Sequence, residues 1–251
     1  MTDTGPPSGI EAFRAAREHV LARIAAACAR AGRAPDAVQL VAVSKTVAAE
    51  RLRDAVAAGL TTLGENRVQE AETKAPDVPG ARWQLVGPLQ SNKARRALDV
   101  FAAIQSVDTV DLAQRLDRLA GAGHGAGPDR RYPVLLQVNV DDDPAKGGFA
   151  PDDLAAALEQ LAGLEALEIR GLMTIGRFVT DAQAARPTFV ALREISDRLR
   201  VSAGLGPELS MGMTDDFEVA VEEGATIVRV GRALFGDRPH HHDSGADEHT
   251  H

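Results

Sequence analysis

Short apolar runs alternate with amphipathic stretches along most of this chain. The runs have the length of buried β-strands, and they lie at Gln39–Val43, Leu60–Leu63, Trp83–Val86, Ala102–Ser106, Val134–Val140, Ile169–Thr174, Glu208–Met211 and Thr226–Val230. Between them, helical spacing of apolar residues predicts helices at Ala48–Ala58, Arg67–Lys74, Ser91–Leu98, Val110–Leu119, Pro151–Leu161, Ala182–Arg200 and Asp215–Glu223. A longer helix, from Glu11 to about Ala31, precedes the first strand. Strands that alternate with helices indicate βαβ units and a parallel sheet.

The number of predicted strands, eight, indicates the fold class. Several runs are apolar at every position, as expected for parallel strands covered by helices on their outer face. A chain of 251 residues suits one (β/α)8 TIM barrel, which typically uses about 250. We therefore expect a single α/β barrel over residues 10–236, with a doubly wound open sheet as the alternative. Residues 1–9 are predicted to be a flexible N-terminus. Residues 237–251 form a polar, His-containing tail, for which disorder is favoured over metal binding.

Charge and composition narrow the function classes. The net charge is −8 without a basic block, which argues against nucleic acid as a partner. No apolar run is long enough to cross a membrane, and the N-terminus lacks a signal-peptide pattern, so a soluble cytoplasmic protein is expected. The single cysteine, Cys28, is predicted to be a small core residue of the first helix.

Lys45 is the first candidate for chemistry. It ends the first strand, and active sites of TIM barrels lie at the carboxyl ends of the strands. A lysine there is either a solvated strand end or an amine held for chemistry. Burial lowers a lysine pKa, and the neutral amine can condense with an aldehyde. Asn66, just after Gly64 and Glu65, is expected to face Lys45 from the neighbouring strand.

The ends of the last two strands suggest a phosphate site. Ser210, Met211 and Gly212 supply a hydroxyl and backbone N–H groups, and Gly231 allows a second close backbone approach. The following Thr214–Asp216 is typical of a helix N-cap. Two ordinary βα turns are the alternative.

Arg229 is unusual because it lies inside an otherwise apolar strand. A guanidinium stays protonated in proteins and must meet an acceptor, either a carboxylate at the rim or a ligand atom with a lone pair. Asn139 and Ser106 are interpreted as structural residues, and Lys93 with the arginines that follow as a solvated helix face.

The chain resembles a known family, the pyridoxal 5′-phosphate (PLP) homeostasis proteins, which are single-domain barrels related to the N-terminal domain of alanine racemase (PLP fold type III). The matching strings are VAVSKT (41–46), GENRVQEA (64–71), GPLQSNK (87–93), SVD (106–108), QVN (137–139), RGLMTI (170–175), LSMGMTDDFE (209–218) and VRVGRALFG (228–236). They occur in the family's order and span nearly all of the predicted barrel.

The resemblance implies the site. It implies a Schiff base between PLP and Lys45, and Arg229 at the pyridine nitrogen. It implies phosphate contacts from Ser210, Met211, Gly212 and Gly231. An arginine at this nitrogen keeps it unprotonated, so the ring is a weaker electron sink than one paired with aspartate. That suits a binding protein better than a transaminase.

Three residues depart from the family pattern. Gln84 and Gln105 stand where histidine is expected, and Arg232 stands where threonine or serine is expected. The two glutamines are interpreted as packing changes. Arg232 either takes over a phosphate contact or points to solvent while its backbone N–H serves.

A racemase of the related two-domain type needs a second base opposite the lysine. The only tyrosine, Tyr132, begins the fifth strand and is expected at the opposite end of the barrel, and neither His19 nor His124 is placed at the rim. We therefore expect a non-catalytic protein of PLP homeostasis, a monomer or weak homodimer with PLP-requiring apo-enzymes as potential partners. The alternative is a weakly active PLP-dependent racemase or lyase with Lys45 as its only base. Lys93 and Lys146 are candidates for a second PLP-carrying lysine.

Overall fold

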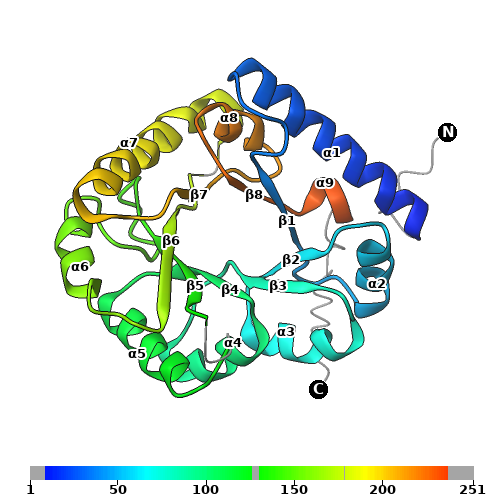
Figure 1. Ribbon diagram of the computed structural model, residues 1–251. Coiled ribbons are helices and arrows are strands. Elements are labelled where there is room, and N and C mark those ends of the chain that lie inside the picture. Colours follow the sequence, from blue (N-terminus) through cyan, green and yellow to red (C-terminus); the bar gives the residue numbers. More distant parts are fainter. Residues whose placement is uncertain (1–8, 126–129, 178, 237–251) are drawn as a thin grey trace, which may run out of the picture.

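The computed structural model describes residues 9–125, 130–177 and 179–236, and it shows a closed barrel of parallel strands in the order β1 to β8 (Figure 1). The strands are β1 Gln39–Val43, β2 Thr62–Glu65, β3 Arg82–Leu85, β4 Ala103–Val107, β5 Tyr132–Gln137, β6 Leu167–Met173, β7 Glu208–Ser210 and β8 Ile227–Val230. The last strand pairs with the first, with Val41 opposite Arg229, and this closes the ring. The (β/α)8 prediction is confirmed, and the open-sheet alternative is wrong.

The helices surround the strands (Figure 1). They are α1 Ile10–Arg30, α2 Ala49–Ala57, α3 Val68–Lys74, α4 Ala94–Val100, α5 Val110–Gly121, α6 Leu154–Leu161, α7 Arg186–Ala203, α8 Phe217–Glu222 and α9 Arg232–Phe235. Short 3₁₀ turns η1 Ala75–Asp77, η2 Ser91–Lys93 and η3 Ala182–Ala185 flank α3, α4 and α7. The predicted strand 60–63 lies two residues later in the structure, because pairing with β3 continues to Glu65. Helix α9 was not predicted.

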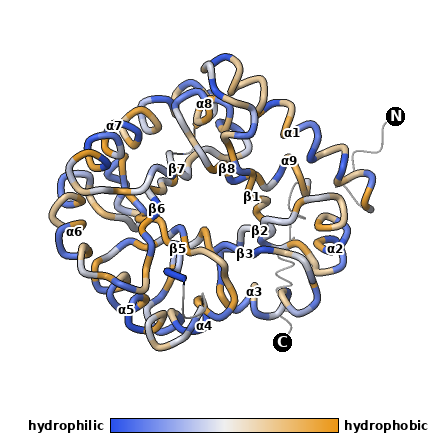
Figure 2. Tube along the Cα trace, in the orientation of Figure 1, coloured by the Kyte–Doolittle hydropathy of each residue, from blue (hydrophilic) through white to orange (hydrophobic). Residues whose placement is uncertain are grey.

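Helix α1 packs outside the ring across α8 and α9 (Figure 1). The predicted buried face is confirmed at Phe13, and Cys28 is a buried core residue. The Phe13 ring meets the edge of the Phe235 ring at 5.8 Å between centroids, and the Arg23 guanidinium lies 4.5 Å from the centre of the Phe217 ring. Polar and apolar segments alternate along the outer helices, as expected for elements with one buried face (Figure 2).

Two layers of side chains divide the core. The larger lies between the strands and the helices. The smaller fills part of the barrel interior and consists of Val41, Val86, Leu135, Met173 and Ile227. Glycine at position 64 leaves room for this cluster, since a Cβ there would lie 2.8 Å from a methyl of Val41. The segments 1–8 and 237–251, predicted to be flexible, lie outside the described residues.

Candidate functional site at the carboxyl rim

The residues predicted for the site follow neighbouring strands of the closed ring, β7, β8, β1 and β2. Val43 pairs with Gly64, so the half-buried Lys45 and Asn66 each lie two residues beyond the paired ends of two neighbouring strands. On the other side of β1, Ala42 pairs with Val230, which sets Val43 beside Gly231. Side chains alternate along a strand, so Lys45 shares the inward parity of Val41, a member of the interior cluster. The structure therefore brings Lys45, Asn66 and Gly231 to one arc of the rim.

The backbone around Lys45 is held in an unusual conformation. Thr46 has φ = 66°, a region that β-branched residues rarely adopt. Its N–H donates to Glu70 Oε1 at 2.7 Å, and the Ser44 N–H on the other side donates to the Gly64 carbonyl at 2.9 Å. Such strain persists only where the surroundings determine it. The neighbours of Lys45 are thus fixed on both sides.

An ionic cluster of Glu65, Glu70 and Lys74, which was not predicted from the sequence, supplies this support. The Lys74 ammonium donates to Glu65 Oε1 at 2.7 Å, to Glu70 Oε1 at 2.6 Å and to the Ser44 carbonyl at 3.1 Å. Glu65 is fully buried, and desolvation raises its pKa despite the opposing effect of Lys74. The Glu70 pKa is lowered, because hydrogen bonds from Lys74 and Thr46 outweigh its desolvation. The spacing of Glu70 and Lys74, one helical turn apart, was the available signal.

The same cluster fixes the turn at Asn66. The Asn66 N–H donates to Glu65 Oε2 at 3.0 Å, so both oxygens of this carboxylate are used. The turn is also crowded by the end of β3, where a Cβ on Gly87 would lie 2.5 Å from the Asn66 carbonyl oxygen. Asn66 therefore sits on a backbone fixed by its neighbours, while its half-buried side chain lies at the rim.

Arg229 is buried in the barrel interior. Its guanidinium donates to Ser210 Oγ and to the Thr174 carbonyl, each at 2.7 Å. Burial lowers its pKa to about 10, while the charge of Asp216 acts in the opposite direction. The side chain therefore remains a cation at neutral pH. A guanidinium has five N–H groups and two are used here, so donors remain for a ligand atom with a lone pair.

Ser210 belongs to a chain of buried polar side chains. Its hydroxyl accepts from Arg229 and donates to Gln105 Oε1 at 2.6 Å, and Gln105 Nε2 donates to Gln84 Oε1 at 2.6 Å. Gln84 and Gln105, interpreted from the sequence as packing changes, thus connect β3 and β4 to β7 and β8. The Ser210 side chain faces this interior chain and is fully buried.

The loop after β7, which was predicted to bind a phosphate, also packs against α8. The Met211 N–H is already used, since it donates to the Ile227 carbonyl at 3.1 Å. Gly212 has φ = 89°, and a Cβ there would lie 2.5 Å from Ala220 Cβ, so the glycine is explained by contact with α8. Asp216 occupies the N-cap position of α8, as predicted, but its side chain makes no capping hydrogen bond, and its carboxylate instead accepts from the Met213 N–H at 2.6 Å. Burial raises the pKa of Asp216.

The loop after β8 leads directly into α9. The Gly231 N–H donates to Thr214 Oγ1 at 3.3 Å, and a Cβ on Gly231 would lie 3.4 Å from the Val43 carbonyl. The Arg232 side chain is half exposed and forms an ion pair with Asp215. Of the two alternatives for Arg232, the structure shows the side chain directed to this surface pair. Within the described part of the chain, the N–H groups of Gly212 and Arg232 donate to no protein acceptor.

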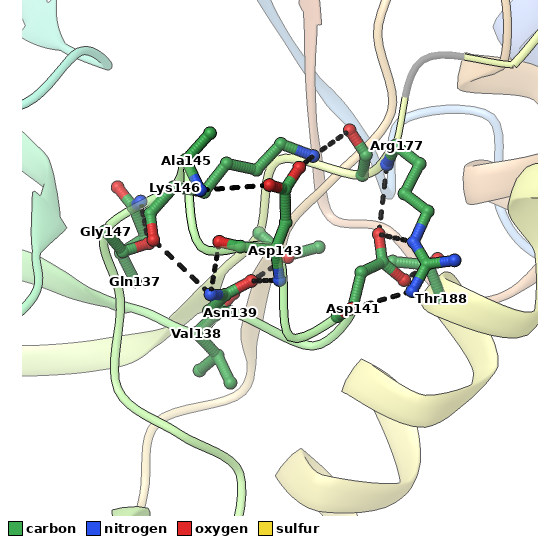
Figure 3. A network of polar contacts seen from close by, with 12 residues as sticks. Gln137, Val138, Asn139, Asp141, Asp143, Ala145, Lys146, Gly147, Arg177 and Thr188 are labelled. Atoms are coloured by element: carbon green, nitrogen blue, oxygen red, sulfur yellow. Dashed lines mark hydrogen bonds and ion pairs between the residues drawn. The ribbon is translucent and has the colours of Figure 1, made fainter.

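The loop after β5 is ordered by Asn139 (Figure 3). Its Nδ2 donates to the carbonyls of Asp143 and Lys146, and its Oδ1 accepts from the Asp143 N–H at 3.1 Å. Lys146 Nζ donates to the Gly176 carbonyl at 3.0 Å and so ties this loop to the one after β6. Asn139 is a structural residue, as interpreted from the sequence. Ser106 is too, since its hydroxyl donates to the Gly87 carbonyl at 2.6 Å.

Tyr132 begins β5, at the amino end of the barrel and away from the rim. It is buried, its hydroxyl donates to the Phe101 carbonyl at 2.6 Å, and burial raises its pKa. Across residues 9–125, 130–177 and 179–236, no helix is long and apolar enough to cross a membrane. The same ranges contain no group of three or more side chains suited to holding a metal ion. The His-containing tail lies outside them.

The fold and its rim correspond to one class of barrel. The family model "Alanine racemase, N-terminal domain" matches residues 17–239. The chain belongs to this family and, within it, to the pyridoxal phosphate homeostasis proteins. A pyridoxal phosphate homeostasis protein of Pseudomonas aeruginosa is 45% identical over 222 residues, which cover 87% of this chain and 93% of that protein. One from Aquifex aeolicus is 40% identical over 87% of this chain and 95% of that protein.

Solved structures agree with this assignment. PipY of Synechococcus elongatus with PLP bound is 44% identical, with a TM-score of 0.73 over 85% of this chain and all of that chain. An alanine racemase of Clostridium difficile shares the fold at 15% identity, with a TM-score of 0.64 over 87% of this chain and 56% of that chain. The resemblance inferred from the sequence motifs is therefore confirmed at the level of family and fold.

Proposed function

We propose that this chain is a PLP-binding protein of PLP homeostasis that holds the cofactor as a reversible Schiff base on Lys45, without catalytic turnover. Membership of the family supports the binding role, as does the PLP-bound structure of a relative 44% identical to this chain. The observation that carries the proposal is the buried Arg229, a cation fixed by Ser210 and Thr174 close to the rim that bears Lys45.

The described residues fit the cofactor. PLP has an aldehyde, a ring nitrogen with a lone pair and a phosphate, which require an amine, a hydrogen-bond donor and several N–H groups. Lys45 supplies the amine and Arg229 the donor. For the phosphate, the N–H groups of Gly212 and Arg232 have no protein acceptor, whereas the Met211 N–H and the Ser210 hydroxyl are already used. The Gly231 N–H also has an acceptor, Thr214 Oγ1. We assign the phosphate to the backbone N–H groups of Gly212 and Arg232, with Gly231 allowing a close backbone approach and Asn66 beside Lys45.

Two features favour binding over turnover. When bound, PLP acts as an electron sink for carbanions, and a permanently protonated arginine at its ring nitrogen weakens that sink. The second feature is the position of Tyr132, which lies at the amino end and donates its proton to a backbone carbonyl. Tyr132 therefore does not supply a second base opposite Lys45.

The test uses absorbance and isotope exchange. Purified protein incubated with PLP should be yellow, and Lys45→Ala should lose the Schiff-base band, whereas Lys93→Ala, a matched change of a partly exposed lysine, should keep it. A colourless wild-type protein would overturn the binding proposal. Turnover is tested separately by α-proton exchange of amino acids in D₂O. Exchange that depends on Lys45 would support the racemase or lyase alternative instead.

A further inference from the structure

A polar cavity lies at the amino end of the barrel, opposite the rim that bears Lys45. Its volume is about 190 Å³, and it is lined by the first residues of several strands together with inward side chains deeper in the barrel. The polar lining residues are Gln39, Arg82, Gln84, Gln105, Arg170 and Glu208. We propose that this cavity binds a small oxyanion, a carboxylate or a phosphate, held by Arg82 and the side-chain amide of Gln84.

Gln84 is the buried group that points to a ligand. It is 5% exposed and accepts a hydrogen bond from Gln105 through Oε1. Its Nε2 donates to no protein atom of the described residues, yet the side chain lines the cavity. No side-chain nitrogen or oxygen of the described residues is both inaccessible to solvent and without a partner, so solvent reaches this Nε2 through the cavity. It is therefore a donor that an acceptor inside the cavity can use.

One arginine at the cavity has no ion pair within the described residues. Arg170 forms an ion pair with Glu208, so these two side chains neutralise each other. Arg82 lies on the same lining, and its guanidinium makes no hydrogen bond or ion pair with the described protein, beyond a longer-range interaction with Glu208. Glu168 also acts on Glu208, so the four local charges balance, and Arg82 is the cation among them that has no ion pair in the described part of the chain. A guanidinium fork matches the two oxygens of a carboxylate or phosphate.

The size of the cavity limits the ligand. Binding sites for drug-sized molecules usually measure about 300–1,000 Å³, so this cavity suits a much smaller molecule. It lies at the end of the barrel opposite Lys45, and its lining is joined to Arg229 by hydrogen bonds through Gln105 and Ser210.

The experiment follows the Gln84 side-chain amide by ¹H–¹⁵N NMR on the PLP-incubated full chain. The signal is assigned by its loss in Gln84→Leu. Inorganic phosphate and malonate are titrated separately, with ionic strength held constant by chloride. We expect a saturable shift with at least one of the two anions, and the responding anion distinguishes phosphate from carboxylate. Malonate also avoids competition at the proposed phosphate site of PLP.

Arg82→Gln should raise the dissociation constant of the responding anion at least tenfold. The matched control is Arg115→Gln, which makes the same change of charge at an exposed arginine of α5 and should keep that dissociation constant within twofold of the wild-type value. The inference is overturned if neither anion gives a saturable shift up to about 50 mM, or if Arg82→Gln binds as tightly as wild type. Loss of the yellow colour in Lys45→Ala tests the PLP proposal separately.

Discussion

Replacing Lys74 by methionine should destabilise the protein strongly, because it removes the only cation that contacts Glu65 in the described structure. Methionine keeps much of the length of the side chain but makes no ion pair. The change removes donors at 2.7 Å from Glu65, 2.6 Å from Glu70 and 3.1 Å from the Ser44 carbonyl. Glu65 is fully buried and would keep a charge without a counter-ion.

The magnitude follows from this burial. Breaking a buried ion pair by removing one partner costs about 3–5 kcal/mol, because the remaining charge is uncompensated. A domain of ordinary stability has only about 5–15 kcal/mol in total. Removing both charges should be milder, since no unpaired ion remains. We therefore expect Lys74→Met to lose about 3–5 kcal/mol, and Glu65→Gln with Lys74→Met to recover about 2 kcal/mol of that loss.

The loss should also depend on pH. Glu65 has a raised pKa in the folded protein, so the fold favours its protonated form. Lys74 lowers the pKa of Glu65, so Lys74→Met raises that pKa further. The destabilisation by Lys74→Met is therefore largest above the folded pKa of Glu65 in the variant, and it should shrink as pH falls from there toward the folded pKa in wild type. The Glu70 pKa is lowered, so its own contribution is lost only below 4.5 and does not confuse this window.

The free energy of unfolding is measured by urea titration at about pH 7 and about pH 5. The proteins compared are wild type, Glu65→Gln, Lys74→Met and the double variant. Lys93→Met is the control for loss of a lysine outside the cluster. The reasoning is refuted if Lys74→Met costs less than about 1 kcal/mol at pH 7, or if the double variant is no more stable than Lys74→Met.

Three further predictions concern the two loops and the interior chain. Gly212→Ala should lower the free energy of unfolding, measured by thermal unfolding, by about 1–3 kcal/mol, because φ at this position is positive and the new Cβ would clash with Ala220. Gly231→Ala should lower it much less, and equal losses would contradict the packing role of Gly212. Gln105→Leu should cost about 1–3 kcal/mol in urea unfolding, since Ser210 loses its acceptor and Gln84 its donor, and a neutral effect would exclude this chain as a stabilising feature. Arg229→Glu should weaken PLP binding or alter its absorbance band, and an unchanged spectrum and affinity would remove its proposed role.

The barrel could be predicted because its strands are marked locally. Each strand is a short apolar run, and the polar residues and glycines that follow the runs are typical of strand ends. Strand bounds were less certain, since β2 extends to Glu65 only through its pairing with β3. Helix α9 was missed because Arg232–Phe235 is too short to show helical periodicity, and the run before it reads as a continuous strand.

The candidate site was predictable where a residue is out of place in its own segment. Lys45 ends an apolar strand and Arg229 lies within one, so each is conspicuous without any tertiary knowledge. The Lys74 cluster was not, because Glu65 ends a strand and Lys74 ends the next helix. Their contact depends on how α3 packs on the rim. Gly212 was predicted as part of a phosphate site, whereas its contact with α8 is a tertiary feature that no local pattern displays.

The hydrogen bonds of the Ser210 hydroxyl limit how the rim can bind a phosphate. A hydroxyl has one proton, and here it goes to Gln105, while a lone pair accepts from Arg229. A phosphate oxygen accepts hydrogen bonds, so Ser210 can donate to it only by abandoning Gln105. Gln105 would then lose one partner inside a buried chain that also contains Gln84. Backbone N–H groups at Gly212 and Arg232 carry no such cost, and the phosphate should therefore be held by the backbone at these two loops rather than by the serine hydroxyl.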